Sequence, residues 1–370
     1  MDARVIPLAE LTAAQTAAWA ELSEHALEPN PFFEPSFVLS AARRLSPGVK
    51  PAIVLVSSGS KVTACLPVLF ESRWRSAPLR CVTTRPTLSA QLNRTGLGTP
   101  LVDRECATDA LGALIDVVRE HGGRDGASLL ALEVFGPGGP VEYHLTEALA
   151  DRGMRACRYE AWTRSMVIRR DEPTYMEEVS SPRHRRELAR RRRRIGEELG
   201  GELELVDRSG DPLALEQLLA LEAVRGRAAD ERVDGVGEEW FRELCSRFND
   251  LGRLRVLSLE ANGRPAAMAC YLLAADGMFC RRISYEPSVA RHSPGLHLDV
   301  AVIERFHSDL AMSWMDSCNL PEDSTTWSMW PDRREVSTLL VPLRRGTGDI
   351  AVRTLKALHV AKQRLRKYQR

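Results

Sequence analysis

The sequence predicts an α/β protein with layers of the α+β type, built as two halves with a strongly basic helix between them. The chain has 370 residues, more than a single hydrophobic core usually organises, so two domains are expected. In each half, short apolar runs alternate with amphipathic stretches, which is the pattern of sheets covered by helices. At the join, Ser181-Pro182 is a helix-start signal, and the charged run RHRRELARRRRRIGEEL follows it.

The first half is expected to open with helices at 11–27 and 36–45, separated by the Pro-rich segment EPNPFFEP. Two apolar runs on either side of SSGS then predict a β-hairpin with strands at 52–56 and 62–70. The later elements alternate between helix and strand, which predicts a layered sheet with packed helices. They are a helix at 108–120, a strand at 128–135, a helix at 141–152 and a strand at 156–169.

The second half should contain three consecutive strands, because the turns NGR and DG between their apolar runs are strong hairpin signals. These strands are expected at 253–261, 264–275 and 277–286. The other elements expected are a strand at 202–207, helices at 212–227, 236–249 and 296–308, and strands at 311–317 and 337–343. A basic amphipathic helix from Val352 closes the chain, so the predicted domain boundaries are 1–175, 176–350 and 351–370.

Composition excludes several classes of protein. With 44% hydrophobic and 27% charged residues, the chain is typical of a globular protein rather than a disordered or fibrous one. No basic, apolar leader and no run of about 18 apolar residues is visible, which predicts a soluble, cytoplasmic protein. The eight cysteines form no C-x-x-C pair, which favours a reducing compartment and argues against a metal site. The net charge of +1 predicts no overall attraction to polyanions.

The stretch most informative about function is R-H-S-P-G-L-H at 291–297, which opens a predicted helix after a Tyr-containing strand. A helix N-terminus presents unpaired backbone N–H groups and the positive end of the helix dipole, so it suits a pyrophosphate. Gly295 would let the backbone approach a ligand closely. These residues predict an anion site of modest specificity, because many loop-to-helix junctions contain a glycine.

Four segments of the second half together resemble the tandem-GNAT acyltransferase group. They are L-x-x-L-E-x-x-R (218–225), LSLEANGRPAAMA (257–269), SYEPSVARHSPGLHL (284–298) and MDSC (315–318). The group includes the acetyltransferase domain first noted in bacterial cellulose-biosynthesis proteins and, more distantly, the Fem-type peptidoglycan aminoacyltransferases. The resemblance covers about 181–345. In the first half, W-x-x-L (19–22) and NPFFEPSF (30–37) resemble the degenerate amino-terminal GNAT half, which implies two GNAT-like halves.

The resemblance implies an acyl-CoA donor, with its pyrophosphate held at the helix start by a motif that is usually R/Q-x-x-G-x-G/A. The matching residues here are Arg291, His292, Ser293, Gly295, Leu296 and His297. This chain departs from the motif, because it has a single glycine and because Pro294 has no N–H to donate. Fem-type proteins take their acyl group from aminoacyl-tRNA and need no such cradle, which keeps that donor as an alternative.

The implied reaction is attack of an acceptor amine on a thioester or ester carbonyl, which needs a base, oxyanion donors and a proton for the leaving group. The side-chain candidates are Tyr285 as proton donor or acceptor binder, Glu286 as a carboxylate at the strand end, and Asp316 as base or amine anchor. Alternatively, Tyr285 is a half-buried aromatic of the sheet and Asp316 a turn residue.

Three further residues are assigned to the acceptor: Arg282, Trp327 and Trp330. The two tryptophans could equally pack under a long loop. Glu222 and Arg225 are one helical turn apart, and the simpler interpretation is a surface ion pair.

Two basic segments have more than one interpretation. The eight arginines from Arg183 to Arg194 could bind tRNA phosphates, or form the exposed face of a helix that buries Leu188, Ile195 and Leu199. The chain has 46 arginines and 5 lysines, so a bias towards arginine inflates this count and favours the second interpretation. The closing helix could lie on an anionic surface, but docking on the second domain is favoured.

The sequence therefore predicts an N-acyltransferase that moves an acyl group, in the first instance acetyl, from acyl-CoA to an amine without a metal. The acceptor is expected to be a small molecule or a compound of the cell envelope or of polysaccharides. Two alternatives remain: a Fem-type transferase that uses aminoacyl-tRNA, and a catalytically inactive GNAT fold that acts as a binding module.

Overall fold

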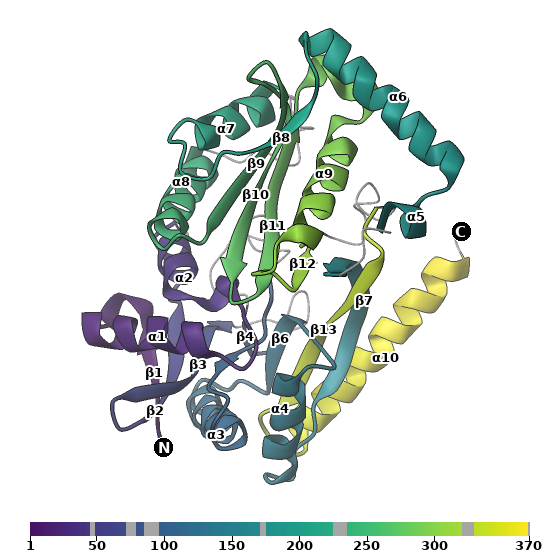
Figure 1. The fold of residues 1–370 in the computed structure, drawn as a ribbon. Coiled ribbons are helices and arrows are strands. Elements are labelled where there is room, and N and C mark those ends of the chain that lie inside the picture. The colour runs from purple at the N-terminus through teal and green to yellow at the C-terminus, as the bar shows by residue number, and fades with distance from the viewer. Residues whose placement is uncertain are drawn as a thin grey trace. The chain divides into compact units, whose positions relative to one another are not determined.

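The computed structural model describes residues 1–44, 49–71, 79–84, 96–170, 175–224, 235–319 and 329–368 (Figure 1). It divides into two compact units, Met1–Trp162 with Glu335–Arg370, and Thr163–Arg334. Two strands cross from one unit to the other, β7 (Cys157–Ile168) and β13 (Asp332–Pro342). Compared with the expected ranges 1–175, 176–350 and 351–370, residues 163–175 group with the second unit, and residues 335–370 group with the first.

The first unit is a mixed sheet. β1 (Asp2–Pro7), β2 (Ala52–Ser58) and β3 (Lys61–Glu71) pair in antiparallel order, and β3 also pairs with the short strands β4 (Cys81–Thr83) and β5 (Leu101–Val102). β4 runs parallel to β6 (Leu129–Phe135), which pairs antiparallel with β13. The hairpin predicted around SSGS is confirmed. β1, β4 and β5 were not expected from the sequence.

The first unit has five helices within the described residues, and four of them lie close to their predicted positions. They are α1 (Ala13–His25), α2 (Pro35–Ala42), α3 (Ala107–Arg124), α4 (Pro140–Ala150) and α10 (Thr347–Tyr368). α1 begins where Thr12 and Gln15 form a capping box, which satisfies two backbone N–H groups of its first turn.

The expectation that the closing helix docks on the second domain is wrong. Val352 and Leu355 of α10 are buried in the first unit, against Leu129 and Leu340 of its sheet. Leu358, on the same helix, is 61% exposed. None of the helices within the described ranges has the length and apolarity that a membrane crossing requires.

The second unit is built on the predicted run of strands. β8 (Glu204–Asp207), β9 (Leu254–Ala261), β10 (Arg264–Ala274) and β11 (Gly277–Tyr285) pair in antiparallel order. β12 (Trp314–Asp316) is parallel to β11 and antiparallel to the end of β7. The hairpin between β9 and β10 turns at Asn262 and Gly263, which both have positive φ as such turns require.

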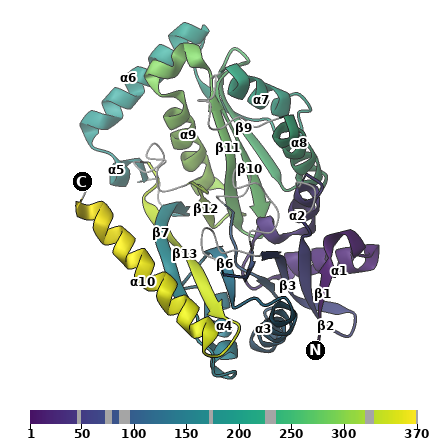
Figure 2. The same ribbon diagram turned by 180° about the vertical axis from the view of Figure 1, so that it is seen from behind.

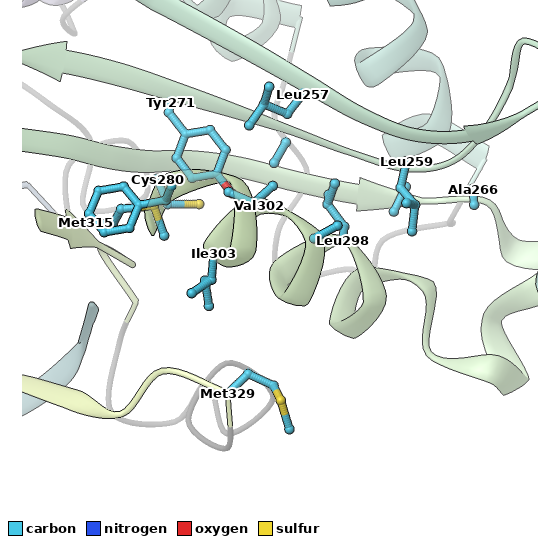
Figure 3. Packing of buried hydrophobic residues seen from close by; sticks show 14 of the residues in the cluster. Leu257, Leu259, Ala266, Tyr271, Cys280, Leu298, Val302, Ile303, Met315 and Met329 are labelled. Carbon is cyan, nitrogen blue, oxygen red and sulfur yellow. The ribbon is translucent and has the colours of Figure 1, made fainter. Parts of the chain in front are cut away.

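Helices cover both faces of this sheet (Figure 1, Figure 2). α9 (Pro294–Ser308) packs on one face, where its Leu298 and Val302 meet Leu257 and Tyr271 of the sheet (Figure 3). α7 (Ala214–Val224) and α8 (Gly235–Asp250) lie on the other face: Glu222 of α7 binds Arg282 of β11, and the Sγ atoms of Cys245 and Cys270 are 3.8 Å apart.

The basic helix α6 (Pro182–Leu199) is attached to the second unit by one apolar stripe. Leu188, Ile195 and Leu199 are buried in the same core as α9, as the helical spacing predicts. Ser181 caps the helix, and Gly200 ends it in the left-handed conformation.

Candidate functional site

The two strands at the centre of the second unit separate after a short parallel pairing. β12 pairs with β11 only from Gly277 to Phe279, whereas β11 continues to Tyr285 alongside β10. A β-bulge lies at the point of separation, because Arg281 has no counterpart between the pairs Cys270–Arg282 and Tyr271–Cys280. β11 therefore continues for six residues beyond its last pair with β12, and α9 begins beyond the end of β11.

The segment between β11 and α9 is fixed by its own hydrogen bonds and by α6. The carboxylate of Glu286, predicted as a catalytic group, accepts the Ser288 N–H at 3.1 Å and caps a 3-10 helix at Pro287–His292. Arg291 and His292 both bind Glu198 of α6, at 2.6 and 2.9 Å. These two predicted phosphate ligands are thus held by a carboxylate of the protein.

The start of α9 presents one open backbone donor. Ser293 has a φ of 59°, and its carbonyl accepts the N–H groups of Leu296 and His297 at 3.0 and 3.4 Å. No side chain caps this helix, Pro294 has no N–H, and the Gly295 N–H has no partner among the described residues. A Cβ on Gly295 would meet only the Tyr285 ring and Ile283, at 3.8 and 4.0 Å, so the glycine leaves room in front of the donor.

His297 lies in the first turn of α9 and is neutral at physiological pH. It is 3% exposed, and its Nε2 has no partner within the described ranges. Burial, aided by the charge of Arg192 on α6, lowers its pKa to about 4. The junction from Tyr285 to His297 thus combines an uncapped helix start with a buried imidazole, which suits an anionic group at Gly295.

Asp316 is enclosed by arginines. Its Oδ2 accepts hydrogen bonds from Arg164 at 2.6 Å and Arg334 at 3.1 Å, and its Oδ1 accepts the Cys318 N–H at 2.9 Å. Asp316 and Arg164 are almost completely buried. Burial acts to raise the pKa of Asp316, but the charges of Arg164 and Arg334 outweigh it, so the pKa is lowered. An ionised carboxylate with both oxygens bound is a poor base, and this geometry favours the turn-residue interpretation.

Arg282, assigned to the acceptor, is bound within the protein. Its guanidinium donates to Glu222 at 2.5 Å and lies 3.9 Å from the centre of the Phe241 ring. Both partners of this ion pair are more than four-fifths buried. Arg225, the expected partner of Glu222, lies outside the described residues, so that pair stays a prediction.

The aromatic candidates fall in different places. Tyr285 is half-buried at the end of β11 and faces Gly295, which fits both of its sequence-based interpretations. Trp330 is completely buried and belongs to the core around α9. Trp327 lies outside the described residues. Of the predicted site residues, the structure thus places the Tyr285 ring on the side of Gly295 where a Cβ would point.

One buried acidic residue was not predicted from the sequence. Asp299 is 4% exposed in the second turn of α9, and burial raises its pKa to about 7. The signal was present, because an aspartate between Leu298 and Val300 interrupts an otherwise apolar helix start. Across the ranges that the structure describes, no group of three His, Cys, Asp or Glu side chains is arranged to hold a metal ion.

Comparison with known proteins agrees with this architecture. A family model described as an acetyltransferase (GNAT) domain matches residues 182–319. The crystal structure of FemX, 9% identical, has a TM-score of 0.57 and covers 92% of this chain and 97% of its own. The C-terminal domain of a putative lysylphosphatidylglycerol synthetase from Agrobacterium fabrum, 13% identical, has a TM-score of 0.50 and covers 91% and 93%.

A conserved protein of unknown function from Bacteroides thetaiotaomicron has 11% identity and a TM-score of 0.54, and covers 90% of this chain and 98% of its own. No curated protein sequence matches the chain. The predicted resemblance and the predicted α/β fold class are confirmed. Residues 182–319 are therefore similar to the GNAT acetyltransferase domains, within a chain that shares its fold with FemX.

Proposed function

We propose that this protein is an N-acyltransferase that moves an acyl group from acyl-CoA to the amine of an acceptor. The observation that supports this most is that β11 continues beyond its pairing with β12 to Tyr285, beside which the open N–H of Gly295 lies at the start of α9. A thioester lying along the free side of β11 would place its pyrophosphate at this helix start, where the dipole and the backbone donor favour negative charge.

In this proposal the chain's own groups have separate tasks. Main-chain N–H groups at the end of β11 stabilise the oxyanion that forms on the carbonyl. Tyr285, next to Gly295, donates or accepts a proton at the reacting end of the donor. Asp316, with Arg164 and Arg334, keeps the end of β12 in position rather than acting as the base.

The acceptor is proposed to be a primary amine of a small molecule or of a cell-envelope component. The fold is shared with the C-terminal domain of a putative lysylphosphatidylglycerol synthetase, which supports the second class. A fold does not fix a substrate, so this part of the proposal depends on a direct screen of amines.

Replacing Gly295 tests the donor site. In calorimetric titrations, acetyl-CoA is expected to bind the wild-type protein, and Gly295→Ala is expected to weaken that binding about tenfold, because a methyl group would stand beside the open N–H of residue 295. Gly123→Ala is the matched control, since a Cβ there meets nothing within 4 Å. If the wild type does not bind acetyl-CoA at millimolar concentration, acyl-CoA is not the donor.

A second candidate is a transferase that uses aminoacyl-tRNA, and the exposed arginines of α6 are the observation that favours it. Glutamates of the same helix bind several of them: Glu187 binds Arg190 and Arg191, and Glu197 binds Arg194. Because these pairs reduce the positive charge that phosphates would meet, we expect weak tRNA binding that changes little when Arg190–Arg194 become glutamine. Strong, salt-sensitive binding that the glutamines abolish would favour the tRNA donor instead.

The third candidate is an inactive binding module, and a Tyr285 variant distinguishes it from an acyltransferase. Such a protein would keep its ligand affinity and show no acyl transfer at any pH. Transfer that falls in a folded Tyr285→Phe variant argues against it.

A further inference from the structure

The closing helix α10 carries apolar side chains on two opposite sides. Its inner side holds Val352 and Leu355, which are buried in the core of the first unit (Figure 2). Its outer side holds Ile350, Ala357 and Leu358, which share one face because they are seven and eight residues apart. Ile350 and Leu358 are 65% and 61% exposed. Single exposed apolar residues are common, but a second apolar side on one helix points to a partner for that side.

The middle of α10 is held in this orientation by a histidine. His359 follows Val352 by two turns, so it lies on the inner side of the helix. Its ring centre is 4.9 Å from that of Tyr159, and its Nδ1 is 3.8 Å from Oε1 of Glu160. The contacts of the inner side thus extend from Val352 to His359, and the face with Ile350 and Leu358 points away from the first unit.

α10 also concentrates positive charge. It contains six of the chain's Lys and Arg residues and a single acidic residue, a net charge of +5 in a chain whose net charge is +1. The acidic residue, Asp349, accepts the Gly346 N–H at 3.0 Å at the start of the helix. Arg353 and Lys356 are exposed, and neither forms an ion pair with a described acidic residue.

The other basic helix, α6, shows what a self-compensated charge looks like. Its Glu187 binds Arg190 and Arg191, both at 2.8 Å, and its Glu197 binds Arg194 at 2.9 Å. The described cations of α10 have no such acidic neighbours on their own helix. The charge of α10 is therefore left for an anion outside the chain.

The two properties of the outer face together select the kind of partner. Cations beside an exposed apolar face are typical of helices that lie in the surface of an anionic membrane, with the apolar side chains below the lipid phosphates. A nucleic acid would use the cations but would leave Ile350 and Leu358 in water. A second copy of the chain would bring two strongly basic helices together, which repel each other.

We propose that α10 is a membrane-surface helix, whose outer face (Ile350, Ala357 and Leu358) enters an anionic phospholipid layer while Arg353 and Lys356 bind the lipid phosphates. The inner face stays on the first unit, so binding requires no unfolding of the helix. This interaction surface is separate from the proposed donor site, and the inference does not depend on the proposed function.

Flotation of the full-length protein with lipid vesicles tests the inference. In about 0.15 M salt, vesicles that contain about one-third phosphatidylglycerol should bind the protein at least about tenfold more tightly than vesicles of phosphatidylcholine alone. Ile350→Ser/Leu358→Ser should weaken binding about tenfold, because the apolar contact with the lipid is lost. Arg353→Gln/Lys356→Gln should weaken it about tenfold as well, and should reduce its dependence on salt.

The matched control is Leu213→Ser/Leu310→Ser, which removes two leucines of the second unit that are 63% and 80% exposed, and it should bind as the wild type does. All the altered side chains are exposed, so these variants keep the fold. Equal binding by Ile350→Ser/Leu358→Ser and the wild type, or no binding of the wild type to the anionic vesicles, overturns the inference.

Two further results would assign the face to another partner and also overturn the inference. One is binding to duplex DNA or tRNA, without binding to vesicles, that Arg353→Gln/Lys356→Gln abolishes. The other is a dimer, seen by sedimentation equilibrium in a protein that does not bind vesicles, which Ile350→Ser/Leu358→Ser dissociates. None of these measurements involves acyl transfer, so their outcomes leave the proposed function untouched.

Discussion

Asp316→Ala is expected to destabilise the second unit by about 3–5 kcal/mol, the usual result of removing one partner of a buried ion pair. The Arg164 guanidinium is 1% exposed and would lose the carboxylate that it now binds at 2.6 Å. Arg334 would lose the same partner, and the Cys318 N–H its acceptor. The free energy of unfolding, measured by urea denaturation at pH 7, checks this directly.

Two further variants serve as comparisons for the stability loss of Asp316→Ala. Asp316→Asn keeps the shape of the side chain and an acceptor for the Cys318 N–H but removes the charge, so its loss should be smaller than that of alanine. The exposed Asp276→Ala should change stability by less than about 0.5 kcal/mol. A loss below about 1 kcal/mol for Asp316→Ala would mean that the three charges do not stabilise the end of β12 as described.

Asp299→Asn is expected to stabilise the protein at pH 8 by about 4 kcal/mol. The folded-state pKa of about 7 lies above the usual aspartate pKa of 3.8. Below pH 3.8 the carboxyl is protonated in both the folded and the unfolded state, so it does not lower the free energy of unfolding. Between pH 3.8 and 7 the unfolded chain releases the proton and the folded one keeps it, so wild-type stability falls by about 1.4 kcal/mol per pH unit and stays lower above pH 7.

The difference between Asp299→Asn and the wild type should therefore be small at pH 4 and grow up to pH 7. Urea denaturation at pH 4, 5, 6, 7 and 8 measures it, with Asp276→Asn as the variant that alters the same charge at an exposed position. A stability difference that is constant across this range would show that Asp299 does not titrate in the folded protein.

Local sequence signals predicted much of the second unit. The turns at NGR and DG placed β9, β10 and β11 within two residues of their observed bounds, and the apolar stripe Leu188, Ile195 and Leu199 predicted the buried side of α6. β4 and β5 escaped notice because strands of three and two residues are too short to show a period. β1 alternates only weakly, and its pairing with β2, about 50 positions later in the chain, fixes it.

The site was less predictable because its contacts join residues that are far apart in the sequence. R-H-S-P-G-L-H indicated a helix start with an open glycine, and the structure has one at Gly295. The sequence around Asp316 gives no sign that this residue binds Arg164, which is 152 positions away. The sequence around Arg291 likewise gives no sign that this residue binds Glu198. Asp299 could have been found, because a carboxylate next to Leu298 on the buried side of a helix is a rare and costly choice.

Amide hydrogen exchange with and without acetyl-CoA tests most directly whether the end of β11 and the start of α9 hold an acyl donor. Bound acetyl-CoA should slow exchange in peptides that cover 280–297, with the Gly295 amide most affected, and leave α3 in the first unit unchanged. Unchanged exchange in 280–297 under saturating acetyl-CoA, or protection confined to α6, would contradict the account.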